Sequence, residues 1–151
     1  METRNYTNDA ITLLKELIAI PSISRNETAA ADKLAEYLNN WGMPYGREGN
    51  NLWVGCQDWD DNRKTVMLNA HIDTVRPVNT WTRDPFIPTQ EGDQIFGLGA
   101  NDCGGGFISF FSLDHSCFLP KATGIAINLQ YLLSNCCIRS FSRNSLQSSS
   151  T

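Results

Sequence analysis

The chain has 151 residues, 41% of them hydrophobic, which is enough for one globular domain with its own core. Its formal net charge of −4 argues against a nucleic-acid partner, and no apolar run approaches the roughly 20 residues of a membrane span or the core of a signal peptide. The five cysteines show no CxxC spacing, so we expect reduced thiols and a cytoplasmic protein.

Two amphipathic patterns occupy the N-terminal part of the chain. Apolar residues at three- and four-residue spacing predict a helix over residues 7–20, capped by its first polar residues and ended by Pro21. A second such pattern predicts a helix from a cap at Asn26 to residue 41. Gly42 follows in the position where glycine commonly ends a helix. This region therefore predicts two helices packed on a core.

Strands are predicted next. Residues 44–49 are expected to form a loop, residues 52–57 a strand and residues 58–62 an acidic turn. The apolar run over residues 66–70 predicts a buried strand that ends at His71. Because open α/β sheets build their sites at the outer ends of strands, the residues around His71 are the first candidates for a site.

The triplet His71-Ile72-Asp73 has the composition of a metal site. A ring nitrogen of His71 can bind a metal ion, and Asp73 can point the same way because side chains alternate along a strand. The Asp73 carboxylate would then hold the other ring nitrogen and fix the tautomer, as is usual for metal-bound histidines. The alternative is a structural histidine with ordinary polar contacts, since His-x-Asp triplets are common.

A second motif, from Phe96 to Gly106, places one carboxylate, Asp102, in a glycine-rich turn. Its glycines allow the backbone to pass close to an ion or a substrate. A phosphate loop fits poorly, because Asp102 stands where the third glycine belongs and no Gly-Lys-Ser/Thr follows. Residues 76–94 between the motifs are loop-rich, with a turn predicted at 90–92 and a short strand at 94–96.

Together, the motifs resemble the co-catalytic zinc family of amidohydrolases and exopeptidases, which includes acetylornithine deacetylase, succinyl-diaminopimelate desuccinylase and aminoacylase. The matching residues are Ala70-His71-x-Asp73-Thr74-Val75 and Gly97-x-Gly99-Ala100-x-Asp102-x-x-Gly105. The resemblance covers about residues 8–106. The family usually has Arg in place of Leu98 and Met-Lys in place of Cys103-Gly104, which bears on the subfamily more than on the family.

The resemblance implies a role for three residues. His71 would be a zinc ligand, Asp102 the carboxylate that bridges two zinc ions, and Asp73 a catalytic residue that orients His71. Cobalt would be a possible substitute for zinc. The implied substrate is a small acylated amino acid or peptide, and the intact relatives are expected to be homodimers without nucleic-acid or membrane partners.

The implied fold is α/β: the start of a mixed-sheet catalytic domain with helices on both faces, truncated and without the lid or dimerisation domain. We assign residues 1–106 to this domain. After Gly106 the composition changes, since 15 of the 16 acidic residues and only two serines precede this point, whereas ten serines follow it. We therefore interpret residues 107–151 as an aberrant or frameshifted tail, partly disordered, with a genuine C-terminal extension as the alternative.

Some local structure is expected in the tail. Residues 108–113 are predicted to continue a helix, and residues 122–133 to form a helix or a strand, with disorder beyond Arg139. Because the tail lacks the family's later strands, we also expect an uncovered edge beside the strand that ends at His71.

The predicted function is zinc-dependent hydrolysis of amide bonds in N-acylated amino acids or short peptides, of the acetylornithine deacetylase type, with this chain an inactive fragment. The family's later Glu-Glu pair and final histidine have no counterpart, since no glutamate follows Glu91 and the context of His115 matches no family motif. A dipeptidase or aminopeptidase is the alternative within the family. A non-catalytic α/β binding module or a degenerate remnant is the alternative outside it.

Overall fold

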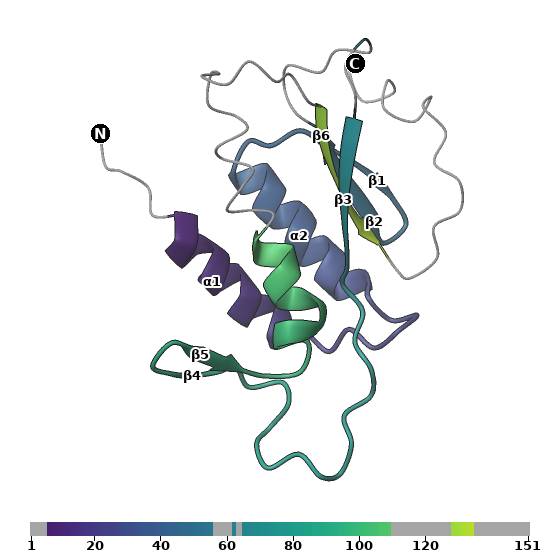
Figure 1. The fold of residues 1–151 in the computed structure, drawn as a ribbon. Coiled ribbons are helices and arrows are strands. Elements are labelled where there is room, and N and C mark those ends of the chain that lie inside the picture. Colours follow the sequence, from purple (N-terminus) through teal and green to yellow (C-terminus); the bar gives the residue numbers. More distant parts are fainter. Residues whose placement is uncertain (1–5, 56–61, 63–64, 110–127, 135–151) are drawn as a thin grey trace.

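In the computed structural model, residues 6–55, 62, 65–109 and 128–134 are described. They form helices, a four-stranded sheet and a two-stranded ribbon (Figure 1). The elements are α1 (Tyr6–Ile18), α2 (Thr28–Asn40), β1 (Tyr45–Glu48), β2 (Asn51–Gly55), β3 (Thr65–His71), β4 (Thr89–Glu91), β5 (Gln94–Phe96), η1 (Ala100–Gly105) and β6 (Asn128–Ser134). The α/β class with a mixed sheet, predicted from the sequence, is confirmed.

The two predicted helices are present, with shifted starts. Helix α1 begins at Tyr6, before the polar residues expected to cap it. Helix α2 begins at Thr28 rather than directly after Asn26, because the chain is still turning there: the Asn26 amide donates to the Ile23 carbonyl at 2.7 Å. The predicted end of α2 is correct, since Gly42 adopts a φ of +65° and donates to the Asn39 carbonyl at 3.0 Å.

A buried carboxylate ties the start of α2 to the sheet. Glu27 is only 1% exposed, and its side chain accepts hydrogen bonds from the Arg25 backbone amide and, at 3.2 Å, from the Asn50 side chain. Asn50 lies in the turn between β1 and β2. Glu27 therefore links the start of α2 to the turn between β1 and β2, 23 residues away in the sequence.

We expect Glu27→Ala to lower the free energy of unfolding by about 1–3 kcal/mol, because it removes a buried acceptor and leaves two part-buried hydrogen bonds unmade. Urea denaturation measures this change. Glu48→Ala, on the exposed end of β1, is the control and should change the free energy by less than about 0.5 kcal/mol. An equal loss in both variants would show that the buried contacts of Glu27 contribute little.

The expected loop over residues 44–49 is wrong, since most of it forms β1. Strands β1 and β2 pair antiparallel, with Glu48 opposite Asn51, so only Gly49 and Asn50 form the turn. Gly49 has a φ of +60°, which a two-residue hairpin turn requires and which glycine adopts without strain. The Gly-Asn pair was the available signal for this hairpin.

The sheet has the order β1-β2-β6-β3 (Figure 1). Strand β6 pairs antiparallel with β2 and parallel with β3, from Thr65 opposite Asn128 to His71 opposite Ser134. A segment of the tail thus lies in the middle of the sheet and makes it mixed. The division of the chain at Gly106 stays a prediction. Among the described residues, the other edge of β3 has no partner strand.

The second hairpin also differs from expectation. The turn was predicted at residues 90–92, but Gly92 and Asp93 form it. Gly92 has a φ of +58° there. Residues 89–91 instead form β4, which pairs antiparallel with the predicted strand β5. Residues 76–88 carry no helix or strand, as expected for a loop-rich segment.

The core lies between the helices and one face of the sheet. Its buried members come from α1, α2, β2, β3 and the helical residues 106–109, and include Leu13, Leu34, Leu38, Leu52, Ala70 and Phe107. On the opposite face of β3, Met67 is 43% exposed. The helices of the described part therefore cover one face of the sheet (Figure 1), and helices on the other face stay a prediction.

Several sequence predictions fall on residues outside the described ranges. These are most of the acidic turn at 58–62, the helix beyond residue 109, the environment of His115 and the disorder beyond Arg139. Residues 122–133 were predicted to form a helix or a strand. Strand β6 covers residues 128–133 of this segment, so the strand is correct for them. Within the described ranges, no helix has the length and apolar character to cross a membrane.

Candidate metal centre

The first part of the site is the end of β3. The strand stops at His71, and three residues later Thr74 forms an isolated parallel bridge with Ile23. The Thr74 amide donates to the Ser22 carbonyl at 2.8 Å, and the Ser24 amide donates to the Thr74 carbonyl at 3.2 Å. The turn after α1 therefore holds the backbone directly beyond Asp73.

The second part is the glycine motif, which forms η1. Gly99 precedes it with a φ of +78°, a left-handed conformation that favours glycine. A Cβ atom on Gly104 would lie 2.5 Å from the Gly99 carbonyl oxygen and 2.6 Å from Leu14 Cδ1. Glycine is thus required at Gly104 for the motif to fold back on itself against α1. This close packing places Asp102 beside the end of β3.

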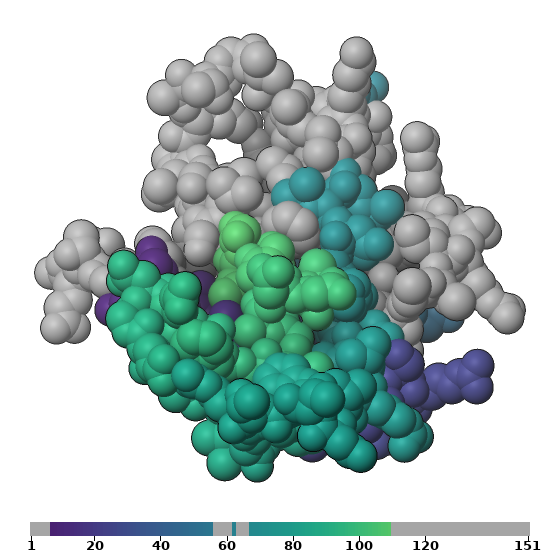
Figure 2. All heavy atoms as spheres, turned by 60° about the horizontal axis from the view of Figure 1, so that its bottom comes forward, coloured from purple at the N-terminus to yellow at the C-terminus, as the bar shows by residue number. Residues whose placement is uncertain are grey.

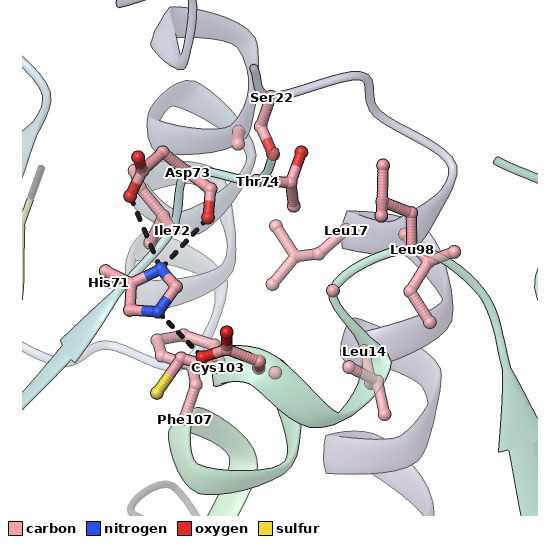
Figure 3. Close-up of a pocket in the computed structure, with 15 residues that line it drawn as sticks. Leu14, Leu17, Ser22, His71, Ile72, Asp73, Thr74, Leu98, Cys103 and Phe107 are labelled. Atoms are coloured by element: carbon pink, nitrogen blue, oxygen red, sulfur yellow. Dashed lines mark hydrogen bonds and ion pairs between the residues drawn. The ribbon is translucent and has the colours of Figure 1, made fainter. Parts of the chain in front are cut away.

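The structure brings the three predicted site residues together (Figure 3). His71 Nδ1 lies 2.9 Å from the Asp73 carbonyl oxygen and 3.3 Å from Asp73 Oδ1. On the other side of the ring, His71 Nε2 lies 3.0 Å from Asp102 Oδ1. The imidazole is therefore held between the Asp73 backbone carbonyl on Nδ1 and the Asp102 carboxylate on Nε2. The roles of these residues stay predictions.

The environment raises the pKa of His71 above its ordinary value. Partial burial is the largest single influence and lowers the pKa, because it disfavours the charged ring. The hydrogen bonds to Asp102 and to the Asp73 backbone, together with the negative charge of both carboxylates, outweigh it.

The donor atoms fit a shared metal ion. Two ligands bound to one zinc ion at about 2.0–2.2 Å each are themselves roughly 2.8–3.6 Å apart for angles near 90–110°. The distance of 3.0 Å between His71 Nε2 and Asp102 Oδ1 lies in this range. The Asp102 side chain is 91% exposed, which leaves its second oxygen accessible, whereas the Asp73 side chain is only 14% exposed. Asp102 is thus placed to bind, and Asp73 to orient.

The site is incomplete within the described residues. No group of three His, Cys, Asp or Glu side chains there could hold a metal ion. The hollow around His71 has a mainly apolar wall that includes Leu14, Leu17, Leu98 and Phe107. Figure 2 shows that this face of the molecule is formed mainly by the chain between β3 and residue 109. Two candidate ligands therefore lie at the mouth of an apolar hollow.

Sequence reasoning missed one residue that touches the site. The Ser24 hydroxyl donates to Asp73 Oδ2 at 2.5 Å. In the sequence, Pro21 marks only the end of the first helix, and nothing in the local pattern shows that the residues after it reach the end of β3. The repeated serines of Pro21-Ser22-Ile23-Ser24 are the one feature that could have drawn attention to it.

Comparison with known proteins gives relatives of one kind. No family model matches the chain. Succinyl-diaminopimelate desuccinylase of Coxiella burnetii (strain RSA 493) is 32% identical over 103 residues, which are 63% of this chain and 26% of that protein. The same enzyme of Blochmanniella floridana is 31% identical over 105 residues, 65% of this chain and 27% of the relative. The chain thus spans about a quarter of the length of these curated relatives.

Solved structures show the same fold. Human carnosine dipeptidase 1 matches with a TM-score of 0.64 at 18% identity, over 86% of this chain and 32% of that one. The metallo-carboxypeptidase Sso-CP2 of Sulfolobus solfataricus matches with a TM-score of 0.63 at 23% identity, over 84% and 30%. A Bacillus subtilis protein described as a dinuclear metal binding peptidase matches with a TM-score of 0.61 at 14% identity, over 87% and 36%.

The fold is therefore that of part of an M20 peptidase catalytic domain, and the match covers about a third of the length of each neighbouring chain. The chain resembles an N-terminal fragment of the amidohydrolase and exopeptidase family that the two motifs indicated. The resemblance predicted from the sequence is confirmed, and its homologues are metal-dependent amidohydrolases and peptidases.

Proposed function

We propose that the intact protein is a metal-dependent hydrolase of amide bonds in N-acylated amino acids or short peptides, and that this chain carries only part of its catalytic centre. The observation that supports this most directly is the placement of His71 Nε2 and Asp102 Oδ1 at 3.0 Å from each other, with Asp73 on the other ring nitrogen. Zinc is the proposed metal, with cobalt as a substitute.

Each of the three residues has a proposed task. The Asp73 backbone carbonyl accepts a hydrogen bond from Nδ1, which leaves the lone pair of Nε2 on His71 available as a ligand. Asp102 offers one oxygen on the His71 side, and its exposed second oxygen can reach a neighbouring ion. Bound zinc would polarise the substrate carbonyl and lower the pKa of a water molecule.

The substrate class follows from the relatives. The curated matches are desuccinylases of an N-acylated amino acid, and the solved neighbours include dipeptidases. An acylated amino acid is therefore the first proposed substrate, with acetylornithine still a prediction from the sequence, and a dipeptide is the second. The proposed setting is a cytoplasmic homodimer that acts on small molecules, without nucleic-acid or membrane partners.

A binding module is the second candidate. The loop after Asp73 exposes three aliphatic side chains, Val75, Val78 and Ile87, which a protein partner could cover. The encoding nucleotide sequence separates the two candidates. If another reading frame downstream encodes a Glu-Glu pair and a later histidine, the enzyme is favoured. If one uninterrupted reading frame ends at Thr151, the binding module or a degenerate remnant of the enzyme is favoured.

The direct test is a hydrolysis assay. It uses the longest protein that can be translated from the encoding nucleotide sequence. We expect it to cleave acetylornithine, succinyl-diaminopimelate or a dipeptide when zinc is added, and to lose this activity with a chelator. The three substrates tested side by side identify the subfamily. Absence of metal-dependent amide hydrolysis on all three would reject the proposed function.

A further inference from the structure

We propose that two copies of this chain pair through the outer edge of β3, in an antiparallel alignment of the strand with its own copy centred on Leu68. The inference goes beyond the proposed function, because it concerns the backbone of β3 and needs no metal. Strand β3 stands last in the sheet order β1-β2-β6-β3, and no strand of the described residues pairs with its outer edge (Figure 1). Such an edge presents backbone donors and acceptors to which a further strand can add.

Strand β3 lacks the features that protect an edge from pairing. It has seven residues, and each of them pairs with one residue of β6, so the strand contains no bulge. Its sequence, TVMLNAH, contains no proline, lysine, arginine or acidic residue. Short length, bulges, prolines and charged side chains are the usual means by which proteins keep edge strands apart. The edge of β3 is therefore suited to accept a partner strand.

The opposite edge of the sheet is protected. Strand β1 has only four residues, and the last two are the charged Arg47 and Glu48. The Arg47 guanidinium binds Asp32 at 2.7 Å and donates to the Gly49 carbonyl at 2.8 Å. Pairing is thus directed to β3. An assembly that uses one edge of each copy is closed at two copies.

The partner is a second copy because β3 matches itself. In an antiparallel alignment centred on Leu68, residue 65 lies opposite residue 71, and Met67 lies opposite Asn69 of the second copy. No like charges meet, since the strand carries no acidic residue, lysine or arginine. Leu68, which packs against the core of its own copy, lies opposite its equivalent on the face that the helices cover. Both copies therefore make identical contacts around a twofold axis.

The experiment measures the mass of the 151-residue chain by sedimentation equilibrium over a range of concentrations. We expect the mass to rise with concentration from 16.9 kDa to twice this value and no further. Hydrogen–deuterium exchange locates the contact. Backbone amides of residues 65–71 should exchange more slowly as pairs form, whereas those of β1 should not change.

Met67→Lys should weaken the pairing by roughly 10-fold, because the two lysines lie diagonally on one face of the joined strands, within reach of each other. Met67 is 43% exposed, so the variant should keep its fold, which its unfolding temperature checks. Val78→Lys is the matched control, since it makes the same kind of change at an exposed residue of the loop after β3. It should leave the pairing unchanged.

A mixing experiment separates loss of pairing from loss of folding. Met67→Glu alone should weaken the pairing as Met67→Lys does. An equimolar mixture of the two variants should recover it, because the lysine of one copy then lies near the glutamate of the other. A variant that fails to fold would not recover on mixing.

The inference is overturned if the mass stays at 16.9 kDa at every concentration, which would mean that another part of the same chain covers β3. Assemblies larger than two copies, or a pair that mixing does not restore, would also overturn it. If Val78→Lys weakens the pairing as much as Met67→Lys, the copies meet through the loop after β3 instead. None of these outcomes bears on zinc binding, so the proposed function is tested separately.

Discussion

The 151-residue chain should show no measurable hydrolysis of acetylornithine, succinyl-diaminopimelate or dipeptides, with or without added zinc. A catalytic zinc takes three protein ligands, and the described residues offer two, His71 and Asp102. Zinc affinity should therefore be poor. The loss of a general base alone lowers the rate by about 10²- to 10⁴-fold. Steady-state assays with and without a chelator measure both effects.

The sheet indicates which part of the chain would carry a general base if one were present. Strand β6 runs parallel to β3, and Ser134 lies opposite His71, so both strands end at the edge that carries the site. The chain after β6 would be the natural source of a further catalytic group. Its next three residues in the sequence are Asn135, Cys136 and Cys137, without a carboxylate. No glutamate follows later in the chain either.

The control for this prediction is the longest product of the encoding sequence, assayed under the same conditions. Turnover by that product and none by the 151-residue chain would agree with the prediction. Measurable turnover by the chain itself, together with tight and stoichiometric zinc, would contradict it. Ligands would then exist beyond the two described here, and Asp114 and His115 would be the first residues to substitute.

The parts of the fold that could be predicted are those with a local signal. The strand that ends at His71 follows from an apolar run, and the end of α2 follows from the single glycine Gly42. The candidate site residues could be named for the same reason, since each motif is a short local pattern, and their roles stay predictions. That His71 and Asp102 are in contact followed from the resemblance and not from either pattern.

The parts that could not be predicted depend on pairing between distant segments. Strand β1 is largely polar in sequence and becomes a strand because β2 pairs with it across a tight turn. Strand β6 is inserted between β2 and β3 from a region whose composition indicated an aberrant tail. The contact between Ser24 and Asp73 joins residues 49 positions apart. Periodicity carries no information about such partners.

One departure from the family pattern fits the structure of the hollow. Leu98 stands where the family usually has Arg, and here its side chain is 8% exposed and lines the hollow near His71. A guanidinium in that position would need a buried partner. The apolar wall beside His71 therefore belongs to this sequence, and it distinguishes its site from that of a relative with Arg.

In the intact protein, we expect His71→Ala and Asp102→Asn each to lower bound metal and activity together, because each removes a charge or lone pair that faces the ion. Asp73→Ala should lower metal affinity less, by about 10-fold, since it removes the carboxylate 3.3 Å from Nδ1 and leaves the backbone carbonyl that bonds to the ring. Protons compete for Nε2, and the pKa of His71 is raised. Zinc binding should therefore fall as the pH is lowered through that pKa.

Metal content by elemental analysis and affinity by chelator competition measure the effects of these three substitutions. Asp93→Asn is the matched control, because Asp93 is an exposed aspartate in the turn between β4 and β5 and should leave both quantities unchanged. Unfolding temperatures of the metal-free variants separate loss of a ligand from loss of the fold. Unchanged metal stoichiometry in both His71→Ala and Asp102→Asn would mean that neither residue is a ligand, and that the ion pair between them is purely structural.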